Sequence, residues 1–312
     1  MVVVVILVIL GAIYGVTLYQ RGVKIQDYVV GLDSDDTAVV LKAMDGLSSC
    51  GRSIVGRVDF YLNNVSPQVR SRAVMVIGAC GASADSAILL PLLERDEDAF
   101  VRRDAAIAIG KLGGDGAIAA LTKQLADDTE DVLVRAAAAR SLGLLDATAS
   151  VPALAEALGN RPAIPQPSPE PEAEEAEAPE DATLPLRLAA AEALGHLGTE
   201  AGIRALAEAA VESTEPSERV RAAVAYALGD AAINNHDEKE ISELLDGLLA
   251  ASGDSVGDVR IAAVQSLGKT ALIPDALRAQ LDQALNDAAA DEHYWVREAA
   301  KQARRELGAL AA

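Results

Sequence analysis

The sequence predicts an all-α protein, an α-solenoid of stacked helix pairs plus one N-terminal transmembrane helix, on three observations. Hydrophobic residues are 51% of the 312 residues but aromatic residues only 3%. A core of Ala, Leu, Val and Ile suits close helix packing better than pleated sheets. A motif recurs along the chain: an aliphatic residue, Arg, Ala-rich positions, then Leu or Ile followed by Gly. Residues 2–19 are apolar and carry no charge.

Residues 2–19 predict a membrane anchor. A helix of that length rises about 27 Å, close to the ~30 Å hydrocarbon core of a bilayer. Only the terminal amine precedes the segment and no small-residue cleavage site follows it, so we expect an uncleaved anchor rather than a signal peptide. Arg21 and Lys24 follow it, and the positive-inside rule then places the rest of the chain in the cytoplasm. The predicted localisation is the cell membrane, single-pass.

Gly11 and Gly15 form a G-x-x-x-G pattern inside this segment. Glycines four residues apart share one helix face and let another helix approach closely. The pattern is also common by chance in apolar segments. Specific helix packing through Gly11 and Gly15 and a plain lipid-facing anchor are therefore both open.

We divide the chain into an anchor (1–20), a juxtamembrane linker (21–32) and a solenoid (33–312). The acidic cluster at 33–36 is interpreted as a helix cap, because it lacks the Gly and the later Glu of a Ca²⁺ loop. Segments 38–47 and 53–62 predict a first helix pair. This pair lacks the motif Arg, as expected of a terminal unit.

The regular copies of the motif follow. They begin at Val69, Val101, Val134, Leu186, Val220 and Val259, and an imperfect last copy begins at Val296. Apart from one longer step between the third and fourth copies, the spacing is in the thirties, which is typical of stacked two-helix units. Apolar residues at helical spacing predict a companion helix beside each motif helix, at 87–93, 118–125, 151–158, 203–210, 241–249 and 277–285.

Each motif position has an expected role. The leading aliphatic residue and the Leu or Ile eight residues later share the core face of the helix. Ala is common four and seven residues after the start, where a small side chain lets helices approach closely. The Gly nine residues after the start is expected to end the helix in the left-handed conformation.

The motif Arg is the least expected feature, because a cation in the first turn opposes the helix dipole. We predict that each Arg donates to a carboxylate or to carbonyls of an adjoining helix and locks the stack. The predicted structural ladder comprises Arg70, Arg102, Arg135, Arg187, Arg221 and Arg260. The alternative is a ladder of ligand-binding arginines.

This pattern resembles the HEAT-like repeat family, most closely the short repeats of phycobilisome lyases. The resemblance covers roughly residues 33–308 and rests on the repeated motif. It implies a right-handed α-solenoid with a concave groove that binds protein partners. It does not identify a function, because such repeats serve mainly as interaction scaffolds.

Two stretches depart from the pattern. An insertion at 160–182 is rich in Pro and Glu, which predicts an extended loop. It is either a spacer or an acidic docking tail for a basic partner. In the last copy, Arg304 and Arg305 replace the usual Leu-Gly, which predicts a capping helix with a polar outer face. Alternatively, the neighbouring Tyr294 and Trp295 are aromatic residues that contact a protein partner.

The formal charge of −20 argues against nucleic acid as a partner, since phosphate binding depends on Lys and Arg. The acidity fits a high-salt host or a basic partner. We find no metal-ligand spacing, nucleophile elbow or P-loop, so we expect no enzyme activity, no cofactor and no metal. The predicted function is a non-catalytic membrane-tethered scaffold that organises protein partners, including an integral membrane partner, as an accessory subunit of a complex. The alternative is a bilin lyase or lyase chaperone acting on a chromophore-bearing protein.

Overall fold

The computed structural model describes residues 22–159, 181–211, 214–215, 217–234, 237–270 and 273–310. The described residues form helices, turns and loops, with no β-strand among them, as the sequence predicts. They belong to two compact units, one up to Ala120 and one from Leu121 onward. The predicted domain boundaries at 20/21 and 32/33 stay predictions, and the insertion at 160–182 lies almost wholly outside the described residues.

The membrane prediction requires a correction. The anchor at 2–19, with Gly11 and Gly15, lies outside the described residues. In the part of the chain that the structure describes, no helix is both long and apolar enough to cross a bilayer. This finding contradicts the single-pass membrane localisation, and the integral membrane partner loses its support with it. The described helices are amphipathic instead: the helix at 22–31, for instance, carries Lys24 and Asp27 on exposed positions.

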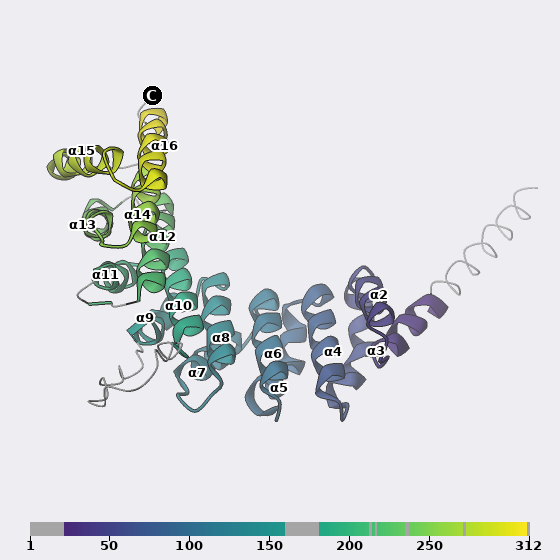
Figure 1. Cartoon of the computed structure of the whole chain (residues 1–312). Coiled ribbons are helices and arrows are strands. Elements are labelled where there is room, and N and C mark those ends of the chain that lie inside the picture. Colours follow the sequence, from purple (N-terminus) through teal and green to yellow (C-terminus); the bar gives the residue numbers. More distant parts are fainter. Residues whose placement is uncertain are drawn as a thin grey trace, which may run out of the picture. The chain divides into compact units, whose positions relative to one another are not determined.

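The first unit begins with the helix at 22–31 and α2 (Thr37–Ser48) (Figure 1). Asp36 caps α2, because its carboxylate accepts a hydrogen bond from the backbone N–H of Ala38 at 2.8 Å. The predicted helix at 53–62 is broken into three short pieces: the 3₁₀ helices η1 (Arg52–Ile54) and η2 (Asp59–Asn63) with α3 (Val55–Val58) between them. The first pair is thus atypical, as predicted for a terminal repeat.

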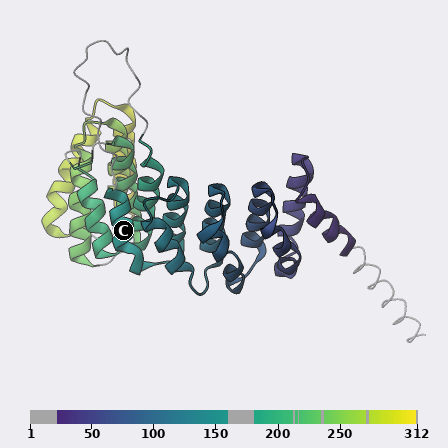
Figure 2. The same cartoon turned by 90° about the horizontal axis from the view of Figure 1, so that it is seen from below.

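Two motif helices complete the first unit, α4 (Pro67–Cys80) and α6 (Ala99–Leu112), which lie side by side (Figures 1 and 2). The companion segment between them consists of η3 (Ser83–Ile88) and α5 (Leu90–Arg95). Asp98 caps α6 through hydrogen bonds from Phe100 N and Val101 N. Ser66 occupies the cap position of α4 without a side-chain cap bond, and Pro67 takes the first turn.

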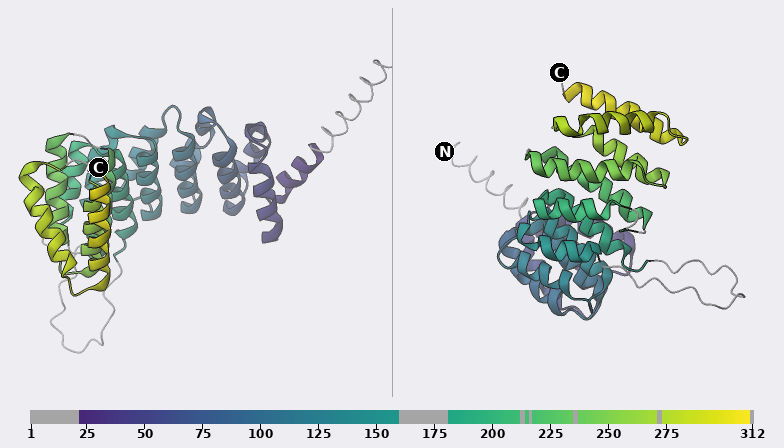
Figure 3. Two further views of the ribbon diagram at one scale, coloured as in Figure 1. Left: turned by 90° about the horizontal axis from the view of Figure 1, so that it is seen from above. Right: turned by 90° about the vertical axis from the view of Figure 1, so that its left-hand side faces the viewer.

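The second unit contains five motif helices: α8 (Val132–Leu144), α10 (Leu184–Leu197), α12 (Glu218–Asn234), α14 (Gly257–Gly268) and α16 (Tyr294–Leu310). The companion helices are α9 (Val151–Gly159, after 3₁₀ helix η4, Thr148–Ser150), α11 (Glu200–Ala209), α13 (Glu238–Ser252) and α15 (Asp275–Ala289). Helix α7 (Ala117–Ala126) contains the division between the units. In the second unit the motif helices form one layer and the companion helices a second (Figures 1 and 3).

The core lies between these layers. The leading aliphatic residue of every motif copy is at most 3% exposed, and burying such a side chain stabilises the fold by about 1.5–3 kcal/mol. The Leu or Ile eight residues later is fully buried in each regular copy, at Ile77, Ile109, Leu142, Leu194, Leu228 and Leu267. The motif therefore supplies one side of a continuous apolar layer within each unit.

The prediction for the motif glycines is wrong. None of them has a positive φ, and they lie inside the helices; α10, for example, continues to Leu197 and ends at left-handed Gly198. The motif Gly instead lets two helices touch. A Cβ added to Gly195 would meet Cα and Cβ of Ala227 at 2.7 Å, and one added to Gly78 would meet Cβ of Ala108 at 2.6 Å. The Gly of one motif helix thus packs against the small residue seven positions after the start of the next.

Candidate protein-binding surface

The motif arginines join neighbouring repeats. The Arg221 side chain is 2% exposed, and its Nε and Nη2 donate to both carboxylate oxygens of Asp254 at 2.6 and 2.9 Å. Asp254 lies in the loop before α14, which belongs to the next repeat. Nη1 of Arg221 donates to the carbonyl of Glu215 at 2.8 Å, in the loop before its own helix. One guanidinium therefore connects the loops of two successive repeats.

The same geometry recurs in both units. Arg70 donates to both oxygens of Asp96 at 2.8 and 2.7 Å and to the carbonyl of Asn64 at 2.9 Å. Arg260 donates to both oxygens of Asp291 and to the carbonyl of Asp254. Arg187 pairs with two carboxylates, of which Glu215 is fully buried and Asp181 lies in its own loop. We call these bonds the arginine–carboxylate ladder.

The acidic half of the ladder was missed in the sequence. The last copy of the motif adds Arg297 to the six arginines of the predicted ladder. An acidic residue lies six residues before five of these seven arginines, as Asp96, Asp181, Glu215, Asp254 and Asp291. The six-residue spacing between acid and Arg could have been detected in the sequence. The acids lie in the loops, outside the helical motif on which the prediction was based. That the ladder serves stacking and not a ligand stays a prediction, although the contacts run between repeats.

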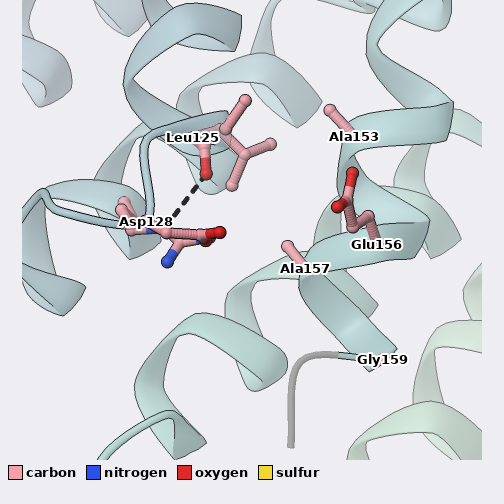
Figure 4. Close-up of a pocket in the computed structure, with 8 residues that line it drawn as sticks. Leu125, Asp128, Ala153, Glu156, Ala157 and Gly159 are labelled. Carbon is pink, nitrogen blue, oxygen red and sulfur yellow. Dashed lines mark hydrogen bonds and ion pairs between the residues drawn. The ribbon is translucent and has the colours of Figure 1, made fainter.

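Arg135 departs from the ladder geometry. Position 129, six residues earlier, is Thr, and Nε of Arg135 donates to the carbonyl of Leu125 at 3.0 Å. Its Nη2 lies 2.9 Å from Asp128, whose side chain is 81% exposed. These residues line a cavity of about 350 Å³, with Glu156 of α9 on the opposite side (Figure 4). Arg102 donates through Nη1 to the carbonyl of Asp96 at 2.7 Å.

We expect the ladder to make stability depend on pH in the acid range. The hydrogen bonds from Arg260, together with that from the His293 backbone, hold the pKa of Asp291 below its usual value despite burial. Asp291 therefore binds a proton more readily in the unfolded chain than in the folded one. Its contribution to the free energy of unfolding is complete above the unfolded pKa of about 3.9. It is lost as the pH falls through the lower folded value. Urea denaturation between pH 5 and 2 should show a smaller acid loss of stability for Asp291→Asn than for the wild type. An equal acid loss in both proteins would contradict this prediction.

The exposed face of the motif helices carries a second regular feature. A helix turns about 100° per residue, so the residue six positions after the leading aliphatic lies on the side away from the companion helix. In the second unit these residues are Arg140, Glu192, Tyr226, Gln265 and Gln302, which we call the variable row. All are exposed except Gln265, which is half-buried. These five residues are of four types, whereas the core and ladder positions keep the same chemistry.

Two pairs of neighbours in the variable row contact each other. Nε of Arg140 lies 3.3 Å from Oε2 of Glu192, and the hydroxyl of Tyr226 donates to Oε1 of Gln265 at 3.2 Å. These contacts join the row across α8 and α10 and across α12 and α14. In the first unit the equivalent positions are Met75 and Ile107, 50% and 39% exposed. The first unit thus presents apolar groups where the second presents polar and aromatic ones.

Two cavities lie along the variable row. One, of about 400 Å³, is lined by Arg140 and Glu192 together with Leu144, His196 and Ile233. The other, of about 460 Å³, is lined by residues of α14 and α16, among them Gln265, Gln302 and Trp295. Each mixes charged or polar side chains with exposed apolar ones: Leu144 is 64% exposed and Ile233 53%.

The predicted aromatic contacts border this surface. Tyr294 and Trp295 are 54% and 62% exposed, and their rings meet edge to face at 5.0 Å between centroids. The guanidinium of Arg297 lies 5.7 Å from the centre of the Tyr294 ring. Their role as partner contacts stays a prediction.

The described residues show little that resembles a catalytic centre. No group of His, Cys, Asp and Glu among them could hold a metal ion. His196 lies 3.6 Å from Asp146, and both side chains are more than half exposed. Cys50 and Cys80 are free thiols, and burial raises the pKa of Cys80.

Stacked two-helix repeats with a buried ladder define an α-solenoid protein. Models of HEAT repeats match residues 56–134 and 176–268, and a model of the PBS lyase HEAT-like repeat matches residues 134–160. The HEAT-repeat matches span more than half of the chain. The chain therefore belongs to the HEAT-repeat family, whose members generally bind other proteins. The PBS lyase repeat favours the lyase-related alternative over the membrane-tethered scaffold.

No curated protein matches the sequence. Among solved structures, human deoxyhypusine hydroxylase in complex with glycerol is similar at 18% identity and a TM-score of 0.39, over 95% of this chain and 99% of that chain. The complex of CpcE and CpcF of phycocyanin lyase from a Nostoc species is similar at 22% identity and a TM-score of 0.42, over 61% and 98%. An engineered protein is similar at 18% identity and a TM-score of 0.49, over 90% and 77%. At such TM-scores the superpositions are too loose to transfer a function.

Proposed function

We propose that this chain is a non-catalytic HEAT-repeat protein that binds a protein partner along the variable row of its second unit. The observation that carries the proposal is the contrast between positions within one motif. Core, glycine and ladder positions repeat their chemistry, whereas the largely exposed position six residues after the start takes four residue types (Arg, Glu, Tyr and Gln) over the five repeats of the second unit. A surface whose chemistry is varied over a constant frame is suited to recognising one particular partner.

The chemistry of the row fits a protein surface. Interfaces combine aromatic and Arg side chains with apolar anchors and a polar rim. Arg140 and Tyr226 of the row and the bordering Trp295 supply the first group, and the neighbouring Leu144 and Ile233 supply exposed apolar area. The surrounding charge of −20 disfavours nucleic acid, because phosphates would be repelled.

Truncating Tyr226 of the row and the bordering Trp295 should weaken partner binding. With the tagged full chain expressed in its host, Tyr226→Ala combined with Trp295→Ala should reduce retention of the co-purifying partner at least about tenfold, as expected for interface hot spots. The matched control is Arg278→Ala on α15, which is exposed on a companion helix. Equal retention by the double variant and the control, with both proteins folded by circular dichroism, would contradict the proposal.

A second candidate function has one observation in its favour, the PBS lyase HEAT-like repeat at 134–160. In this alternative the bound partner carries a bilin, and the chain acts as a chromophore lyase or as its chaperone. Incubating the purified chain with a bilin and an apo-phycobiliprotein distinguishes the two. Bilin attachment that depends on the chain would favour the lyase. Unchanged absorption, together with capture of a partner that carries no chromophore, would favour the non-catalytic binder.

A further inference from the structure

The motif helix α16 carries a line of cations. Arg297, Lys301 and Arg305 of α16 are four residues apart and therefore share one helix face. The equivalent residues of α14 are Arg260, Val264 and Gly268. Val264 is fully buried, and a Cβ on Gly268 would meet Cα of Ala303 at 2.7 Å. Arg260 and Gly268 of α14 contact the next repeat, and Arg297 and Arg305 occupy the same positions on α16. We call Arg297, Lys301 and Arg305 the terminal stripe; Lys301 and Arg305 also line the cavity between α14 and α16.

Arg297 repeats half of the ladder geometry. Its Nη1 donates to the carbonyls of Asp291 and Glu292 at 2.7 and 2.8 Å. Nη1 of Arg260 donates in the same way to the loop before its own helix, while its Nε and Nη2 bind the carboxylate of Asp291 in the next repeat. Within the described ranges, no acceptor is bonded to Nε or Nη2 of Arg297. Arg297 therefore presents a guanidinium edge that has no carboxylate partner among the described residues, although its Nη1 is held as in the earlier repeats.

The surroundings of this edge favour an anionic group. The Tyr294 ring lies against the Arg297 guanidinium at 5.7 Å and helps to fix its orientation. Arg305 is exposed and lines the cavity beside Trp295. Lys301 pairs with Glu298 at 2.6 Å, but both groups are exposed, so the pair is readily exchanged. This face is locally basic on a strongly acidic chain.

We propose that the terminal stripe binds an acidic helix of a protein partner, whose carboxylates bind these cations as the carboxylates of the ladder bind Arg70, Arg221 and Arg260. The inference rests on the proposed function and names the chemistry of the partner. A carboxylate is favoured over a phosphate because Arg70, Arg221 and Arg260 each hold one in bidentate geometry with the same two nitrogens. The negative net charge of the chain repels an acidic partner at long range. We therefore expect attraction only through direct contacts with the three cations of the terminal stripe.

The test uses the full chain and a fluorescent 16-residue helical peptide with three Glu residues four positions apart. A matched peptide carries Gln at the same positions. Fluorescence anisotropy should show binding of the Glu peptide alone. The triple variant Arg297→Gln, Lys301→Gln, Arg305→Gln should weaken it at least tenfold. Arg297→Lys alone should weaken it severalfold, because an ammonium cannot bind a carboxylate through two parallel bonds.

The control Arg278→Gln removes an exposed cation from α15 and should leave peptide binding unchanged. Equal binding to the wild type and the triple variant, or equal binding of both peptides, would overturn the inference. So would stronger binding to vesicles of anionic lipid than to the Glu peptide, or self-association that the triple variant abolishes. Tyr226→Ala should not alter peptide binding. Loss of peptide binding at the terminal stripe can therefore be distinguished from loss of partner binding at the variable row.

Discussion

Replacing Arg221 with Met is expected to lower the free energy of unfolding by about 3–5 kcal/mol. The reason is the burial of its partner: the Arg221 and Asp254 side chains are each 2% exposed. Met fills much of the space of the Arg stem but supplies no charge, so the carboxylate of Asp254 stays in the interior without its bidentate donor. Urea denaturation followed by circular dichroism measures the loss.

Two controls separate the buried ion pair from general damage. Arg278→Met removes an exposed cation from α15 and should produce no measurable change. The double variant Arg221→Met, Asp254→Leu removes both charges and should recover most of the stability, because apolar groups often replace a buried pair without loss. If the single variant were as stable as the wild type, the ladder would not hold the repeats together.

The second large effect is expected at the glycine contacts. Gly195→Ala places a methyl group 2.6 Å from the carbonyl oxygen of Ala227 and 2.7 Å from its Cα. Since backbone atoms cannot move aside as a flexible side chain can, α10 and α12 must separate. We expect a destabilisation of about 1–3 kcal/mol, the usual effect of overpacking, in spite of the better helix propensity of Ala. Thermal and urea unfolding measure it.

Gly308→Ala is the matched control for this substitution. It lies in α16, and a Cβ there would meet nothing within 4 Å. Ala should leave stability unchanged or raise it slightly. Adding Ala227→Gly to Gly195→Ala should restore part of the loss by reopening the contact. A Gly195→Ala protein as stable as Gly308→Ala would show that the helices are not in close contact.

The sequence predicts the repeat architecture well because the information is redundant. Core positions such as Val134 and Leu142 recur with helical spacing in copy after copy, and their burial follows from that spacing. The role of the motif glycines was predicted wrongly because Gly is favoured both where a helix ends and where two helices pack closely. Only the register between two helices, which places Gly195 against Ala227, distinguishes them.

The candidate surface could be predicted only in part. Trp295 was found because it is the only Trp of the chain, whereas the variable row has no common residue type and becomes visible only once the helices are aligned. Tyr226, for example, looks like an isolated aromatic until its hydroxyl is placed beside Gln265 of the next repeat. The membrane prediction rested only on the apolar composition of residues 2–19. It is contradicted because no described helix is long and apolar enough to cross a membrane.

Site-specific photocrosslinking tests the central claim most directly. A photoreactive phenylalanine analogue is placed in the full chain at Tyr226, at Gln302 or, as control, at Arg278, and each protein is irradiated in its host. The account predicts the same discrete crosslinked protein from Tyr226 and Gln302 and none from Arg278. Crosslinks from Arg278 alone, or an equal yield from all three positions, would show that the variable row is not the binding surface.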